Sequence, residues 1–166
     1  LPRPRPDQLA IWTFAGSPAF SSGAPIAPTA TGSGAPTLTM LDAEIDENGK
    51  DGQPYTDFKG VAHPADRAGA WNDIKKNDAP DAELVLKLDT TGWSELTLRF
   101  DYKSESAAGY NLDYSLDGGA SWTALLVQEG LVADYNWQTA RVDLSNWGGI
   151  ENRSSLWLRI DHLEDT

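Results

Sequence analysis

Apolar and polar residues alternate with a period of two through most of the second half of the chain. The pattern is clearest in the segments 84–88, 96–102, 110–115, 140–144 and 156–161, where every second residue is apolar or aromatic. Such alternation is typical of antiparallel strands that bury one face. Turn-rich segments separate these strands, with no helical pattern between them. The sequence therefore predicts an all-β fold, an antiparallel β-sandwich.

The first half of the chain carries a weaker pattern. Residues 1–8 alternate Pro with Arg and Leu, which predicts an extended N-terminal segment ahead of a single domain at 9–166. The elements expected before residue 83 are strands at 9–14 and 37–41, surface loops at 16–36 and 42–57, and one short helical turn near 64–70.

A compact turn motif, S-x-D-x-G-x-x-W, runs from Ser115 to Trp122 between two strand-like segments. Asp117 is expected to accept hydrogen bonds from nearby backbone N–H groups. Gly118 and Gly119 can adopt the positive φ that a short hairpin needs, and Trp122 is expected to open the returning strand and lie over the turn.

This motif resembles the Asp-box of sialidases and other extracellular β proteins. A sialidase propeller needs several similar blades, and the motif occurs once in this chain. We therefore expect it to stabilise one hairpin and not to mark a propeller.

A wider resemblance rests on the run ELTLRFDYKSESAAGYNLDYSLDGGASW at 95–122, the opening IWTF and the later TARVDLSNW. Together they resemble the jelly-roll modules of secreted bacterial multidomain proteins, which are similar in build to carbohydrate-binding modules. The resemblance covers 83–161 well and implies a jelly-roll-like sandwich in a secreted protein. Such modules commonly close with one more strand after an acidic loop, and we expect that loop to begin at 161–166. The expected domain therefore lacks its final strand, or another part of a larger protein supplies that strand.

The charge and composition of the chain exclude several kinds of binding partner and site. The chain has 25 acidic and 13 basic side chains and a formal net charge of -12. Nucleic-acid binding needs a basic footprint, so we expect no nucleic-acid partner, and an anionic membrane surface is disfavoured for the same reason. No apolar run approaches the roughly 20 residues of a membrane span. Cysteine is absent, which excludes disulfides, thiol catalysis and thiolate zinc sites.

Tryptophan is unusually frequent, with seven residues. Two interpretations are open. The rings can build the core of the sandwich, or some of them can lie exposed as a platform on which a sugar stacks.

The polar side of the alternating strands is the first candidate site. It combines one indole ring with guanidinium, carboxylate and amide groups, an inventory that suits stacking on sugar C–H faces and hydrogen bonding to hydroxyls. The alternative is a solvated sheet face with cross-strand Arg–Asp pairs, each contributing roughly 0.2–1 kcal/mol. The residues expected on this side are Arg99, Asp101, Asn111, Asp113, Arg141, Asp143, Trp157, Arg159 and Asp161. Trp157 needs a partner, because it is a tryptophan in a polar register.

A second candidate lies at the loop edges, since binding residues concentrate on loops. Its members are Trp71, Trp93, Tyr135, Trp137 and Trp147, each next to turn residues. The alternative is that these rings cap the ends of the sandwich core.

Acidic clusters suggest a structural calcium ion, because calcium binds six to eight oxygen ligands. The early loop contains Asp42, Glu44, Asp46, Glu47, Asn48 and Asp51, and the C-terminal cluster contains Asp161, Glu164 and Asp165. The spacing does not fit an EF-hand. We expect Asp42, Glu44, Asp46 and Asp161 as the metal ligands, against the alternative of a plain acidic loop.

Catalysis has the weakest support. His63 and His162 are the two histidines and lie far apart in the sequence, and no G-x-S-x-G elbow is present. Glycoside hydrolysis needs a pair of carboxylates, but any of the 25 acids could form such a pair, so their presence does not indicate a hydrolase.

We therefore expect a non-catalytic module that binds a polysaccharide or glycan through Arg99, Asp101, Asn111, Asp113, Trp137, Arg141, Trp157 and Arg159. The alternative is a structural or adhesion domain that contacts neighbouring domains of a larger protein without binding sugar. A hydrolase with a cryptic site is the third possibility.

Overall fold

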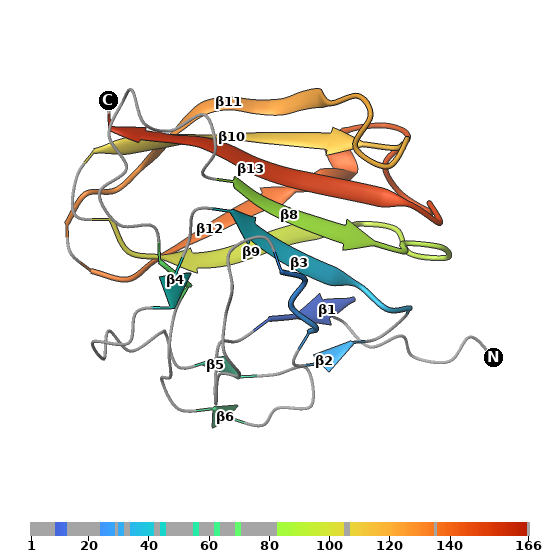
Figure 1. Ribbon diagram of the computed structural model, residues 1–166, viewed down its shortest axis with the longest axis horizontal. Coiled ribbons are helices and arrows are strands. Elements are labelled where there is room, and N and C mark those ends of the chain that lie inside the picture. The colour runs from blue at the N-terminus through green and yellow to red at the C-terminus, as the bar shows by residue number, and fades with distance from the viewer. Residues whose placement is uncertain are drawn as a thin grey trace.

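The computed structural model confirms the all-β prediction (Figure 1). It describes residues 9–12, 24–28, 30–31, 34–41, 44–45, 55–56, 62–63, 69–70, 83–104, 107–134 and 136–165. These residues form strands and one short 3-10 helix, η1 (Leu144–Asn146). None of the helical structure in the described part of the chain is long and apolar enough to cross a membrane.

The long strands lie in the second half of the chain, where the alternation is clear. They are β8 (Glu83–Leu88), β9 (Thr97–Tyr102), β10 (Ala108–Ser115), β11 (Thr123–Leu131), β12 (Gln138–Asp143) and β13 (Leu156–Asp165). The earlier strands are β1 (Ala10–Ile11), β2 (Ala30–Thr31), β3 (Thr37–Leu41), β4 (Glu44–Ile45), β5 (Tyr55–Thr56), β6 (Ala62–His63) and β7 (Gly69–Ala70).

Two sheets form the body of the sandwich. One is a five-stranded antiparallel sheet with the strand order β11-β10-β13-β8-β3, and the other is the antiparallel pair β12-β9. In Figure 1 the pair crosses behind the larger sheet, while the two-stranded pairs β1-β2 and β5-β6 gather beyond β3. The sandwich is confirmed, and its jelly-roll connectivity stays a prediction.

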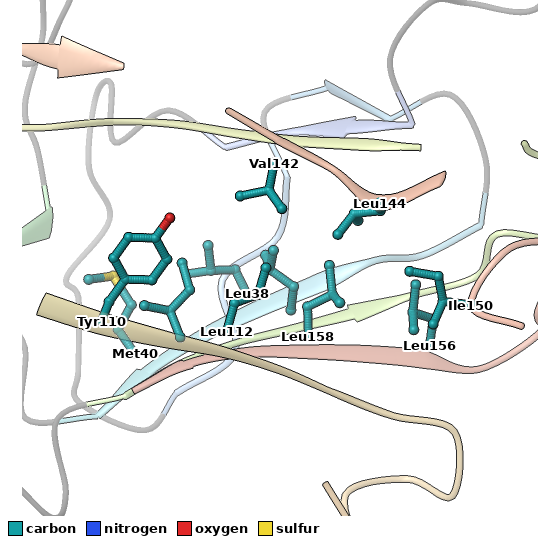
Figure 2. Packing of buried hydrophobic residues seen from close by; sticks show 11 residues of the cluster. Leu38, Met40, Tyr110, Leu112, Val142, Leu144, Ile150, Leu156 and Leu158 are labelled. Atoms are coloured by element: carbon teal, nitrogen blue, oxygen red, sulfur yellow. The ribbon is translucent and has the colours of Figure 1, made fainter. Parts of the chain in front are cut away.

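The core lies between the two sheets. Leu156, Leu158 and Ile160 of β13 turn their side chains inward and are almost fully buried. Figure 2 shows Val142 and Leu144 pointing from the opposite layer toward this sheet. The alternation along each strand thus places its apolar side chains in one shared interior, where each fully buried leucine contributes roughly 1.5–3 kcal/mol.

The C-terminal strand is longer than the alternation predicts. We expected a loop from residue 161, but β13 continues to Asp165 and pairs with β10 through Gly109–Glu164 and Ala108–Asp165. β13 occupies the middle of the five-stranded sheet, with β8 on its other side. Pairing with its neighbours keeps this acidic segment extended, although its sequence does not alternate.

The first half also differs from the prediction. The expected loop at 16–36 contains β2, and the expected loop at 42–57 contains β4 and β5. Most of the expected helical turn near 64–70 lies outside the described residues, and its last two residues form β7.

Candidate functional site

The predicted polar residues are divided between the two sheets. Because both sheets turn their apolar sides toward the shared core (Figure 2), their polar sides face away from each other. We call the outward side of the five-stranded sheet, with Lys87, Trp122, Trp157 and Arg159, the Trp122–Trp157 face. Of the predicted ligand-binding residues it holds Asn111, Asp113, Trp157 and Arg159. We call the outward side of β9 and β12 the Arg99–Arg141 face; it holds Arg99, Asp101 and Arg141.

Arg159 is the centre of the Trp122–Trp157 face. Its Nη2 lies 2.6 Å from Oδ2 of Asp113, and its Nη1 lies 3.9 Å from Oε2 of Glu83. Its Nε lies 3.0 Å from Oδ2 of Asp161 but donates no hydrogen bond among the described residues, so that contact is ionic only. Three carboxylates therefore share one guanidinium. Only 23% of its side-chain surface is exposed, and a charge that is largely removed from water is costly unless it is paired.

A cation lies over each tryptophan ring of this face. The Arg159 guanidinium is 4.4 Å from the centroid of Trp122, and the Lys87 Nζ is 4.0 Å from the centroid of Trp157. These are cation–π distances. Lys87 stands directly opposite Trp157 in the β8–β13 register. Lys87 is therefore the partner that the sequence analysis expected for Trp157.

The turn motif has the hydrogen bonds that the sequence predicts. Oδ1 of Asp117 accepts from the Ser121 backbone N–H at 2.9 Å and from the Ser115 hydroxyl at 2.7 Å, and Oδ2 accepts from the Ser121 hydroxyl at 2.5 Å. The bonds from Ser121, followed by the one from Ser115, lower the pKa of Asp117 to about 2. Gly118 and Gly119 have φ of 75° and 89°. The prediction of a hairpin built on this carboxylate is confirmed.

The same turn packs against the two tryptophans. A Cβ atom added to Gly119 would lie 2.8 Å from Cζ3 of Trp157 and 3.6 Å from Cζ2 of Trp122. Glycine is therefore required by close approach as well as by its positive φ. The turn joins β10 and β11 and also holds the ring of Trp157 on the neighbouring strand.

The side chain of Asn111 binds the backbone of the edge strand β11. Its Oδ1 accepts a hydrogen bond of 2.8 Å from the backbone N–H of Gln128. Gln128 has a φ of 51°, and the β10–β11 register shifts in this region, as expected for a bulge. This side chain stabilises the irregular part of β11, which explains its place on the sheet.

The Arg99–Arg141 face is more open. Arg99 and Arg141 are direct partners in the β9–β12 register, and both are exposed, Arg99 with 58% of its side-chain surface. Arg99 contacts Asp101 at 3.3 Å, and the Thr139 hydroxyl donates to the same carboxylate at 2.7 Å. In the described part of the chain Arg141 makes no hydrogen bond or ion pair. Its guanidinium donors face solvent.

Asp143 lies next along this face and is the last residue of β12. Its carboxylate caps η1 by accepting from the Ser145 backbone N–H at 3.0 Å and from the Ser145 hydroxyl at 2.6 Å. These bonds, and to a smaller extent the charge of Arg141, lower the pKa of Asp143. Asp143 is therefore a structural cap beside the arginine pair.

Trp137 marks the other end of the same face. It directly precedes β12, and the alternation Trp137, Thr139, Arg141 places it on the outward side. Asp134 organises the preceding turn, because its carboxylate accepts from the Asn136 N–H at 2.9 Å and from Nε2 of Gln138 at 3.0 Å. These bonds, the one from the Asn136 N–H first, lower the pKa of Asp134. The Trp137 ring is half-buried.

Most of the remaining described tryptophans pack against the core of the sandwich. Trp147 packs against the core, as the core-capping alternative predicts, and so does Trp12, whose Nε1 donates to the Ile26 carbonyl at 3.0 Å. Trp93 is half-buried in a turn. Trp71 and Tyr135 lie outside the described residues.

Most of the predicted calcium ligands lie outside the described residues. Asp42 and Asp46 lie outside them, as does the side chain of Glu44, and Asp161 contacts Arg159. No group of three His, Cys, Asp or Glu residues able to hold a metal ion occurs in the part of the chain that the structure describes. Calcium stays a prediction, and a chelator that leaves the melting temperature unchanged would contradict it.

Sequence reasoning missed three members of these faces, namely Lys87, Trp122 as the partner of Arg159, and Thr139. Only the pairing of the strands could have identified them, because the partner of each lies in a different segment of the chain. No family model, curated protein or solved structure matches the chain. The functional argument therefore rests on the geometry of the two faces.

Proposed function

We propose that this domain is a non-catalytic carbohydrate-binding module of a secreted protein and that its site is the Arg99–Arg141 face. The observation that supports this proposal is an exposed, directly opposed arginine pair on a strand pair that also carries Asp101 and Thr139, with Trp137 directly before β12. Such a surface offers forked donors and a carboxylate for sugar hydroxyls, with an indole ring at one end for stacking.

The choice between the two faces follows from which groups are available. On the Trp122–Trp157 face, the guanidinium is held by three carboxylates and each indole already has a cation over it. A ligand there would have to break these contacts. On the Arg99–Arg141 face, Arg141 can bind a ligand without breaking any hydrogen bond or ion pair within the described residues.

A binding role without a reaction is also supported by the acids of this face. A general acid in glycoside hydrolysis needs a raised pKa. Hydrogen bonds from Ser145 lower the pKa of Asp143, and Asp101 accepts from Thr139 and contacts Arg99. The lowered pKa of Asp143 favours its charged form and does not favour proton donation.

Calorimetry and affinity electrophoresis across a panel of soluble polysaccharides test the proposal. We expect Trp137→Ala and Arg141→Gln each to weaken binding at least tenfold, which corresponds to about 1.4 kcal/mol. Lys87→Gln is the matched control, because it removes a cation from the opposite face and should leave affinity unchanged. Binding that survives Trp137→Ala and Arg141→Gln but is lost in Lys87→Gln would overturn the assignment of the site.

One observation favours the alternative, a structural or adhesion domain. β11 is the last strand of the five-stranded sheet, and Val127 near its middle is 69% exposed. The strand contains no Lys, Arg or Pro, the residues that commonly protect a sheet edge. A neighbouring domain of a larger protein could add a strand there. If so, Val127→Lys should abolish association in sedimentation velocity and leave glycan binding unchanged.

A further inference from the structure

We infer that the Arg99–Arg141 face selects glycans that carry an anionic group, either a sugar carboxylate or a sulfate ester. The inference rests on the proposed function and adds the charge of the ligand to it.

The two arginines occupy positions at which opposite charges would normally stabilise a sheet. They are direct cross-strand partners, so their Cβ atoms are separated by roughly 4.5–5.5 Å. Like charges placed directly opposite each other destabilise a strand pair. An anion held between the two guanidinium groups would remove this repulsion, and it would explain why a chain with a net charge of -12 places two cations together.

The donors of this pair are largely unused. Arg141 makes no hydrogen bond or ion pair within the described residues. Arg99 reaches Asp101 only through contacts of 3.3 and 3.5 Å, which are long for a charge-assisted hydrogen bond. Two guanidinium forks can therefore turn toward one ligand. Guanidinium is the side chain best suited to bidentate binding of carboxylates and to planar recognition of oxyanions.

The neighbouring acids are occupied by other donors. Oδ1 of Asp143 accepts from the backbone N–H and the hydroxyl of Ser145, and Asp101 accepts from Thr139 at 2.7 Å. The acids farther away act weakly, because the Debye length at 0.15 M salt is about 8 Å. Hydrogen bonds do not cancel the charge of the Asp101 and Asp143 carboxylates, so an anionic ligand is favoured only where it contacts the two guanidinium groups directly.

The length of the face indicates the size of the ligand. Trp137 lies four positions before Arg141 along an extended segment, which is about 13 Å at roughly 3.3 Å per residue. This backbone separation is longer than one monosaccharide ring. We therefore expect an oligosaccharide that stacks on Trp137 and places an anionic group between Arg99 and Arg141.

Matched pairs of polymers test the inference. Polygalacturonate and its methyl ester differ in the carboxylate, and dextran sulfate and dextran differ in the sulfate. We expect the wild-type protein to bind the acidic member of at least one pair tenfold more tightly by calorimetry at 0.15 M salt. The pair that shows the preference identifies the anionic group.

Variants separate this inference from the proposed function. The double variant Arg99→Gln/Arg141→Gln should bind the acidic and the neutral polymer equally, whereas Lys87→Gln should keep the preference. Equal binding of both polymers by the wild type, or a preference that persists in the double variant, would overturn the inference. If Trp137→Ala still abolishes binding in that case, the carbohydrate-binding proposal stands. If the wild type binds none of a wide glycan panel, both fail.

Discussion

The two outward faces of the sandwich contain similar side chains but use them differently. On the Trp122–Trp157 face, Arg159 is surrounded by three carboxylates and lies over an indole ring. On the Arg99–Arg141 face, two arginines stand opposite each other, and Arg141 makes no hydrogen bond or ion pair within the described residues. The difference follows burial, because a charge in the middle of a five-stranded sheet is largely removed from water and must be paired. A charge on an exposed strand pair stays hydrated and remains available.

The largest expected effect is the loss of Arg159. Replacing it with Gln removes the guanidinium from Asp113 and Asp161, whose side chains are 12% and 10% exposed. We expect the free energy of unfolding to fall by about 3 kcal/mol in urea denaturation. Adding Asp113→Asn to the same variant should recover part of this loss. A change below about 0.5 kcal/mol would show that the Trp122–Trp157 face is not held together by its charges.

A second test compares the two glycines of the turn. Both have positive φ, but an added Cβ meets nothing within 4 Å at Gly118 and approaches Trp157 to 2.8 Å at Gly119. We expect Gly118→Ala to cost about 1 kcal/mol through backbone strain alone. Gly119→Ala should cost at least about 1 kcal/mol more, because the ring must move. Equal thermal shifts for the two variants would contradict the packing of the turn on Trp157.

The pH dependence of stability tests the carboxylate of the turn. The folded-state pKa of Asp117 is about 2, below the ordinary value of 3.8. The folded protein therefore binds fewer protons than the unfolded chain in this interval. The contribution of Asp117 is fully present above the unfolded value and is lost as the pH falls toward 2.

Replacing Asp117 with Asn should accordingly flatten the dependence of the unfolding free energy on pH between about pH 4 and pH 2. Leu116→Ala, in the same turn, is the control that should keep the wild-type slope. An unchanged slope in Asp117→Asn would mean that other carboxylates dominate acid unfolding.

The smallest expected effect lies on the Arg99–Arg141 face. Arg141→Gln removes an exposed side chain that has no hydrogen bond within the described residues. We expect the free energy of unfolding to change by no more than about 0.5 kcal/mol, with a small gain where repulsion from Arg99 is relieved. If the free energy of unfolding falls by more than about 1 kcal/mol in urea denaturation, Arg141 stabilises the fold. The two faces would then not differ in the way described.

Much of the fold could be predicted because alternation is a local signal. The strands around Leu86, Leu98, Leu112 and Leu158 follow from it, as does the hairpin at Asp117. The extension of β13 beyond Asp161 could not be predicted, since its acidic sequence remains extended through pairing with β10. The short strands before residue 83 are stabilised by partners elsewhere and leave little periodic trace.

The candidate site was predicted only as a set of residue types. The Arg and Asp residues of β9, β10, β12 and β13 were all expected on the polar sides of their strands, and the described pairings are consistent with that. Their division into two faces could not be predicted, because alternation tells which side of its own sheet a residue occupies and not which sheet its strand joins. The contact of Lys87 with Trp157 depends on pairing between β8 and β13, which are far apart in the sequence.

The sequence by itself determined the strands of the second half, the inward and outward side of each, and the turn from Ser115 to Trp122. These features depend on neighbours within a few residues, so the local order of side chains suffices to specify them. The tertiary structure decided which polar sides share a face and which charges are paired. Strand order arises from contacts between distant segments, and burial in the assembled sheet determines whether a cation such as Arg159 is neutralised or, like Arg141, stays available to a ligand.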